Sequence, residues 1–259
     1  MARLGARQLI TGQGVVNTIR IMTYQVDGCR GGDGKISIDR VLDVVAEGAP
    51  DIVALQGADT ENNGGQVALL ARQLGMSWYA NQRQGANAYL SCYPLNAIQE
   101  YTLGANGSCL RADTTIDEKR LHLFNVCFDP RPGRRLQQVN QLLGPELLGH
   151  PSLVCPTLLL GDFGDLSWGA GNLNLALTLR KARRPWWPGT YPARWPLFGR
   201  DRAYLKGELR IVEASILRSL KARQASSHLP LVLTVQIKDP RTYLRNDKLA
   251  PGRMEVAPG

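Results

Sequence analysis

The sequence predicts one α/β domain that contains mixed β-sheets, and three observations lead to this prediction. Apolar runs rich in β-branched residues alternate with segments whose apolar residues recur at helical spacing. Other strand-like runs follow one another directly, with only turn residues between them, as in β-hairpins. No shift in composition marks a linker in the 259 residues, and no internal repeat is present. Strands that alternate with helices favour parallel pairing, and hairpins give antiparallel pairing. We therefore expect parallel and antiparallel pairs in the same sheets.

The first predicted unit is a strand, a loop and a helix. Ile19–Val26 is apolar and rich in strand-forming residues, and the turn-forming stretch DGCRGGDGK follows it. Ile38–Glu47 has apolar residues at helical spacing, which predicts an amphipathic helix. Pro50 ends this helix, and the apolar run DIVALQG, Asp51–Gly57, predicts a second buried strand.

The remaining elements continue the same alternation. Helices are predicted at Val67–Leu74 and Arg134–Leu148, where apolar residues fall on one face. Short apolar runs bounded by turn residues predict strands at Asn87–Leu90, Leu110–Thr115, His122–Val126, Leu158–Leu160, Ala203–Lys206 and Leu231–Ile237. Residues 238–259 are polar, charged and contain proline, so we expect a domain over residues 1–237 followed by a loosely held tail.

Composition narrows the class of protein. The chain has 31 Lys+Arg against 22 Asp+Glu, a net charge of +9, which favours a polyanionic partner such as nucleic acid or an anionic lipid surface. Its five cysteines lack the close pairs of a zinc site or a disulfide framework, which indicates reduced thiols. No uninterrupted apolar segment reaches the ~18 residues needed to span a membrane, and the first residues lack the apolar core of a signal peptide. We therefore expect a cytoplasmic protein.

Chemically suggestive residues stand at the ends of several predicted strands. In order, the motifs are IRIMTYQVDGCRGGDG, PDIVALQG, LHLFNVCFD, LLLGDFGD, RDRAYL and SSHLPLVLTV. Together they resemble the endonuclease/exonuclease/phosphatase superfamily, which includes deoxyribonucleases and apurinic endonucleases. The resemblance covers Ile19 to Ile237. It implies a four-layer α/β/β/α sandwich of two mixed sheets flanked by helices. The implied chemistry is magnesium-assisted hydrolysis of a phosphoester.

The resemblance also implies the roles of individual residues. Asp162, His228 and Asp201 match catalytic positions, with Asp201 orienting the ring of His228. The positions that would bind the substrate are Gln25, Cys127, Gly164 and Ser227, and the positions that would hold the metal are Asp27 and Gly57.

Five of these positions depart from the family pattern. Gly57 stands where the family has the Glu that is its principal metal ligand. Gln25 replaces Asn, Cys127 replaces His, Gly164 replaces an Asn that contacts phosphate, and Ser227 replaces Asp. Because Mg²⁺ prefers oxygen ligands, these changes predict an impaired or non-catalytic member that keeps a cleft for a phosphate ester.

Several alternatives stay open at this stage. The chain could be an active Mg²⁺-dependent phosphodiesterase, with Mg²⁺ as its cofactor, or a basic module that binds nucleic acid or an anionic membrane surface without a cofactor. Cys127 could be a reactive thiol, although a small apolar group filling space is the more common role. The run RRPWWPGTYPARW, 183–195, could contact such a ligand or pack a long loop onto the domain.

Overall fold

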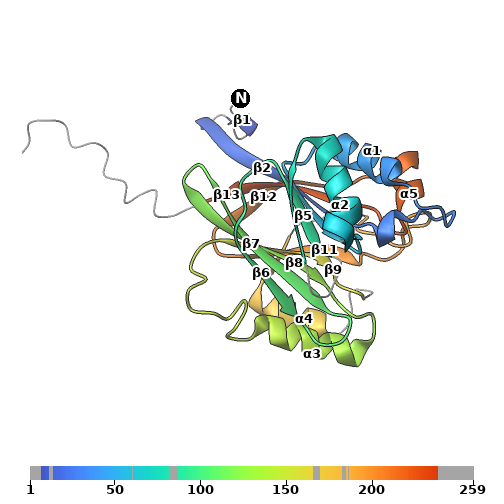
Figure 1. Cartoon of the computed structure of the whole chain (residues 1–259). Helices are drawn as coiled ribbons and strands as arrows, with labels where there is room; N and C mark the ends of the chain where they lie inside the picture. The colour runs from blue at the N-terminus through green and yellow to red at the C-terminus, as the bar shows by residue number, and fades with distance from the viewer. Residues whose placement is uncertain are drawn as a thin grey trace, which may run out of the picture.

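The strands form two mixed sheets that pack face to face (Figure 1). A computed structural model describes residues 7–11, 14–59, 61–81, 87–165, 170–182, 185 and 187–238. In this part of the chain, the first sheet has the strand order β12-β13-β2-β3-β5-β4, with β1 paired to β2. Its strands are β1 Arg7–Thr11, β2 Gly14–Gln25, β3 Ile52–Gln56, β4 Ser77–Ala80, β5 Ala88–Ser91, β12 Leu209–Ile216 and β13 Leu231–Ile237.

The second sheet has the order β10-β11-β9-β8-β7-β6. Its strands are β6 Asn96–Thr102, β7 Ser108–Ile116, β8 Lys119–Cys127, β9 Thr157–Asp162, β10 Arg180–Lys181 and β11 Asp201–Lys206. One pair in each sheet is parallel, β2 with β3 and β8 with β9, and the other described pairs are antiparallel. The mixed sheets predicted from the sequence are therefore confirmed.

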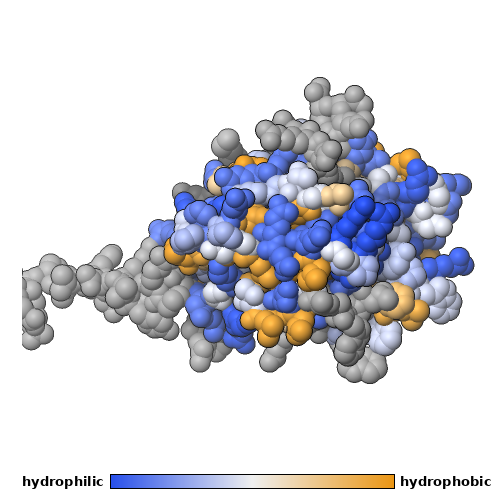
Figure 2. Space-filling model, turned by 90° about the horizontal axis from the view of Figure 1, so that it is seen from below, coloured by the Kyte–Doolittle hydropathy of each residue, from blue (hydrophilic) through white to orange (hydrophobic). Residues whose placement is uncertain are grey.

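Helices cover the outer faces of both sheets and complete four layers (Figure 1). On the first sheet lie α1 Ile38–Gly48, α2 Glu61–Leu74 and α5 Leu220–Ala225, while α3 Pro132–Leu143 and α4 Ala170–Thr178 lie on the second. Seen from the α3 and α4 side, the surface is largely hydrophilic with separate hydrophobic areas (Figure 2). No helix among the described residues is long and apolar enough to cross a membrane.

Strand β8 shows how the alternation of side chains builds two apolar layers. Leu121 and Leu123 belong to the core that includes the first sheet, whereas Phe124 and Val126 pack with α3 and α4. This separation follows from the period of two along a strand, which sends neighbouring side chains to opposite faces. Asn125 is fully buried on the same face as Leu123, so a polar side chain points between the sheets.

The helix predicted at Arg134–Leu148 is too long at its C-terminal end. Helix α3 ends at Leu143, and Gly144 adopts an extended conformation with φ −67° and ψ 171°. The next residue is Pro145, which sterically disfavours the helical conformation of the residue before it. The expected tail begins at Lys238, and its residues 239–259 lie outside the described part of the chain.

Candidate functional site

Strand ends from both sheets meet at one edge of the sandwich. Asp162 ends β9 and faces Asp201, the first residue of β11, across an antiparallel pair. Cys127 ends β8 and lies beside Asp162 in the parallel pair. His228 lies between α5 and β13. The hydroxyl of Ser226, two residues earlier, donates to the Gln25 carbonyl oxygen at 2.7 Å. The strand ends that carry Cys127, Asp162 and Asp201 therefore lie together, with His228 beside them.

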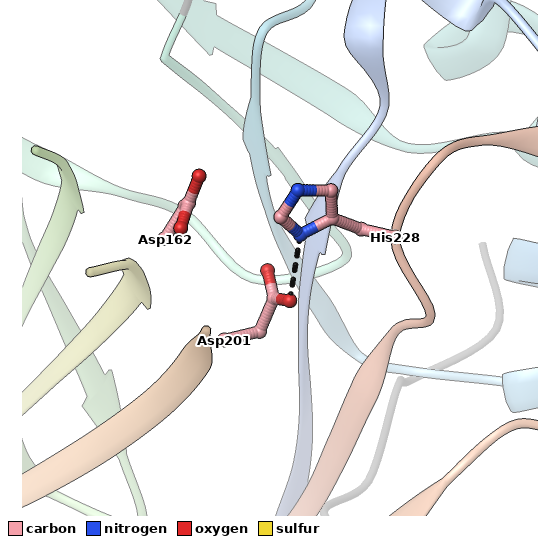
Figure 3. Close-up of side chains that lie close together, drawn as sticks. All are labelled: Asp162, Asp201 and His228. Atoms are coloured by element: carbon pink, nitrogen blue, oxygen red, sulfur yellow. Dashed lines mark hydrogen bonds and ion pairs between the residues drawn. The ribbon is translucent and has the colours of Figure 1, made fainter. Parts of the chain in front are cut away.

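The His228 and Asp201 side chains form the pair expected from the sequence. The distance between His228 Nδ1 and Asp201 Oδ2 is 2.8 Å, and both side chains are buried. Burial alone would lower the pKa of His228, but the charge of Asp201 and its hydrogen bond outweigh this effect. The pKa of the ring therefore lies above its ordinary value. In Figure 3 the second ring nitrogen points away from Asp201.

Asp162 is paired with Arg200, a residue that sequence reasoning did not identify. Arg200 donates from Nη2 to Asp162 Oδ2 at 2.8 Å and from Nε to Oδ1 at 3.2 Å. The backbone N–H of Gly164 donates to the same Oδ1 at 2.9 Å. Burial raises the pKa of the Asp162 carboxyl, while the charges of His228 and Arg200 act against this rise. Both carboxylate oxygens of Asp162 are thus already engaged.

Tyr191 contacts both cationic side chains of the site. The Arg200 guanidinium carbon lies 4.8 Å from the centre of the Tyr191 ring, a cation–π distance. The Tyr191 and His228 rings are also 4.8 Å apart and tilted by 47°. Tyr191 was not identified from the sequence, since it lies in a loop with several other aromatic residues.

Gly57 adopts a left-handed backbone conformation with φ +62°, which favours glycine. A Cβ at this position would overlap Oε1 of Gln25. This buried oxygen has no hydrogen-bond partner among the residues that the structure describes. The longer amide at position 25 therefore lies against the place where a side chain at position 57 would begin.

Gly164 is also left-handed, with φ +67°. A Cβ there would lie 2.8 Å from the Phe128 carbonyl oxygen and 3.1 Å from that of Asp129. Because both atoms belong to the backbone, the loop would have to move to accept a side chain at position 164. Gly164 contributes its N–H to Asp162 instead.

Asp27 and Ser227 bond to each other. The Ser227 hydroxyl donates to Asp27 Oδ2 at 2.6 Å, and Asp27 is exposed in a short 3₁₀ turn, Asp27–Cys29. Among the described residues, the group that could hold a metal ion consists of Asp162, Asp201 and His228, and Asp27 is not part of it.

Burial raises the pKa of the Cys127 thiol, and the nearby Asp162 raises it further. A thiol with a raised pKa stays protonated at neutral pH and is a poor nucleophile. Although Cys127 is partly exposed, the raised pKa gives no support to the reactive-thiol hypothesis.

The donor atoms of Asp162, Asp201 and His228 lie within 4.8 Å of one another, a spacing that could hold a metal ion (Figure 3). Magnesium, however, needs several oxygen ligands in near-octahedral geometry. Both oxygens of Asp162 accept hydrogen bonds from Arg200, one oxygen of Asp201 contacts His228, and position 57 has no side chain. The side chains in this arrangement do not fit Mg²⁺.

A polar network beneath the site was missed by sequence reasoning. Asn125 donates from Nδ2 to the carbonyl oxygens of Leu55 and Ala88, at 2.9 and 3.0 Å. Its Oδ1 accepts from Gln56 Nε2 at 2.7 Å, and Gln56 Nε2 also donates to Thr23. These buried bonds join β8 to the first sheet next to Gly57 and Cys127.

The loop that contains the run RRPWWPGTYPARW, 183–195, has parts that pack onto the domain and parts that are exposed. Ala193 N–H donates to the Ser227 carbonyl oxygen at 2.7 Å, and Trp187 Nε1 donates to the Pro196 carbonyl oxygen at 2.6 Å. Trp195, in contrast, is 72% exposed and lines a pocket of about 750 Å³ together with Arg194 and Ser227. Both sequence interpretations of this run therefore retain support, and its residues 183, 184 and 186 lie outside the described part of the chain.

Comparison with known proteins identifies a family and a fold. The model of the Endonuclease/Exonuclease/phosphatase family matches residues 22–228. No curated protein matches the sequence.

Solved structures with similar folds include the catalytic domain of human Nocturnin with a bound sulfate anion, at 18% identity and a TM-score of 0.71. This match covers 85% of the present chain and 95% of the Nocturnin chain. A mannosyl-6-phosphatase from Bacteroides thetaiotaomicron has 13% identity and a TM-score of 0.72, over 84% of this chain and 99% of that one. D. rerio TDP2 with a single-strand DNA product has 15% identity and a TM-score of 0.66, over 85% and 99%.

Proposed function

Because the chain belongs to the endonuclease/exonuclease/phosphatase family, we propose that it binds a phosphate ester beside Asp162, Asp201 and His228 and hydrolyses it slowly or not at all. One combination of features carries this proposal: the Asp201–His228 pair is retained, whereas position 57 lacks the Glu that binds the metal in the family. Asp201 holds His228 at 2.8 Å, whereas position 57 is a left-handed glycine against the Gln25 amide.

The retained pair suits the binding of a phosphate oxygen. Asp201 accepts a hydrogen bond from Nδ1 of His228, which fixes the orientation of the ring and leaves the other nitrogen facing away from Asp201. When the ring is protonated, this nitrogen donates to an oxygen of the ester. Such a donor, held in place before the ligand arrives, can also stabilise charge that develops during hydrolysis.

Hydrolysis requires more than this donor. A water molecule must be activated and the phosphoryl group must be polarised, which a divalent cation does in many hydrolases. The His228 donor and a divalent cation would both stabilise the transition state. Since the side chains do not fit Mg²⁺, the site keeps the donor and lacks the cation. Losses of this kind commonly cost a few kcal/mol, and ~1.4 kcal/mol is a factor of ten in rate.

The test is hydrolysis of bis(p-nitrophenyl) phosphate with and without Mg²⁺, by the unmodified protein and by Asp162→Ala. We expect release of p-nitrophenol at or only slightly above the rate without protein, with no increase when Mg²⁺ is added. Trp78→Ala, a change in an exposed side chain of β4 away from the site, serves as the control for preparation artefacts.

A second candidate is an active Mg²⁺-dependent phosphodiesterase, favoured by the close spacing of Asp162, Asp201 and His228. Hydrolysis that depends on added Mg²⁺ and disappears in Asp162→Ala would favour this candidate over ours. The TDP2 structure holds a DNA product, so nucleic acid is one class of ester to include among the substrates.

A further inference from the structure

We propose that Arg200 takes the place of a divalent cation in this site, so that phosphate esters bind there without a metal ion. This inference rests on the proposed function, since it concerns how the same site holds its ligand. The main observation behind it is the bidentate hydrogen bonding of the Arg200 guanidinium to the Asp162 carboxylate.

One edge of the Arg200 guanidinium is bonded to Asp162, and another edge is available to bind a ligand. Nε and Nη2 donate to the two carboxylate oxygens, while Nη1 donates to no residue in the described part of the chain. The Arg200 side chain is 19% exposed, so a ligand in solution can reach it. An arginine has five donors in a rigid plane, and two edges of this plane can bind two anions at once.

Charge balance gives the reason for a fixed cation. Asp162 and Asp201 place two carboxylates where a phosphate ester would bind, and an anion would be repelled by them. In metal-dependent hydrolases the divalent cation offsets this repulsion. Here Arg200 and the ring of His228 lie beside the two carboxylates and supply donors for the phosphate oxygens.

The same contact opposes metal binding. A divalent cation that bound Asp162 would have to break both hydrogen bonds from Arg200 and place its own charge next to the guanidinium. Position 57 supplies no carboxylate to offset that repulsion. Tyr191 supports the arrangement, because its ring contacts both Arg200 and His228 and limits how far either can move.

The experiment is isothermal titration calorimetry with inorganic phosphate, in buffer with EDTA and in buffer with Mg²⁺. The unmodified protein should bind phosphate with the same affinity in both. Arg200→Gln should weaken phosphate binding at least about tenfold, because a hydrogen bond to a charged group is lost. Arg72→Gln, an exposed residue in the last turn of α2 outside the site, is the matched control and should change the affinity by less than about twofold.

A second titration, with Mn²⁺, tests the exclusion of metal. Arg200→Gln should bind Mn²⁺ more tightly than the unmodified protein, since Asp162 is then released. Phosphate binding that requires Mg²⁺ in the unmodified protein, or an affinity for phosphate that Arg200→Gln leaves unchanged, would overturn the inference. The absence of phosphate binding in both buffers would instead overturn the proposed function, and circular dichroism of Arg200→Gln verifies that the variant is folded.

Discussion

Replacing Asp162 with asparagine should strengthen phosphate binding, which is the opposite of what a metal-dependent site predicts. The substitution keeps the shape of the side chain and an oxygen that can accept from the Gly164 N–H. It removes the negative charge that now offsets Arg200. The guanidinium is then free to pair with the phosphate alone.

The magnitude follows from Coulomb's law. The charges concerned are those of the Asp162 carboxylate and the bound phosphate. Two unit charges of the same sign about 6 Å apart repel by about 3 kcal/mol at an effective dielectric constant of about 20. Arg200 is partly exposed, so water and salt reduce this value. We expect a net gain of about 1–2 kcal/mol, which is roughly five- to thirtyfold in affinity.

The same substitution should destabilise the protein in the absence of ligand. Asp162 is buried, and removing one partner of a fully buried ion pair costs about 3–5 kcal/mol. Since Arg200 remains in contact with water, a loss of roughly 1–3 kcal/mol is expected. Phosphate should restore part of this loss, because a ligand that binds only the folded state stabilises it.

The assay is calorimetric titration of Asp162→Asn with phosphate in EDTA, together with urea unfolding followed by tryptophan fluorescence. An affinity for phosphate that falls below that of the unmodified protein would refute the reasoning. Asp162 would then contact the ligand favourably, directly or through a bound cation.

Of three further predictions, two concern residues beside the site, and the third concerns Asp113 and His122, a buried pair nearer the other end of β8. Asn125→Ala should lower the free energy of unfolding by about 3 kcal/mol, since three buried hydrogen bonds are lost, whereas the exposed Asn140→Ala should change it by less than about 0.5 kcal/mol. Iodoacetamide should label Cys127 far more slowly in the folded protein than in urea, because burial raises the pKa of its thiol, and equal rates would contradict its protonated state. Burial raises the pKa of Asp113, but its hydrogen bond to His122 and the charges of His122 and nearby arginines lower it more. Its carboxylate therefore stabilises the fold above its unfolded pKa of about 3.9, and this contribution is lost as the pH falls through the lower folded pKa. Acid unfolding curves of Asp113→Asn should accordingly be flatter below about pH 4, and a curve parallel to that of the unmodified protein would speak against this contribution.

The fold could be predicted from local patterns wherever a buried strand is bounded by turn residues. The strand predicted at Leu231–Ile237 has the observed bounds, and the helix predicted at Ile38–Glu47 ends one residue short of α1. Edge strand β12, Leu209–Ile216, was missed because only its two end residues are buried and its sequence is not continuously apolar. The overlong helix after Arg134 shows how an apolar pattern can continue through a proline that ends the helix.

The candidate site was partly predictable because some of its residues follow strands. Asp162 and Asp201 lie at neighbouring strand ends, so their proximity follows once the strands pair. Arg200 was missed because it belongs to the run RWPLFGRDR, 194–202, where the sequence does not show which arginine turns inward. Asn125 was missed because it lies inside an apolar strand motif, although a polar residue at an inward position was a usable signal.

The most direct measurement is a crystal structure of the protein grown with both phosphate and Mn²⁺. The anomalous scattering of Mn²⁺ distinguishes it from water and from phosphate. We expect phosphate density in contact with Arg200 and His228, and no anomalous peak beside Asp162. A Mn²⁺ peak coordinated by the Asp162 carboxylate, with Arg200 displaced from it, would contradict metal-free binding of the phosphate ester.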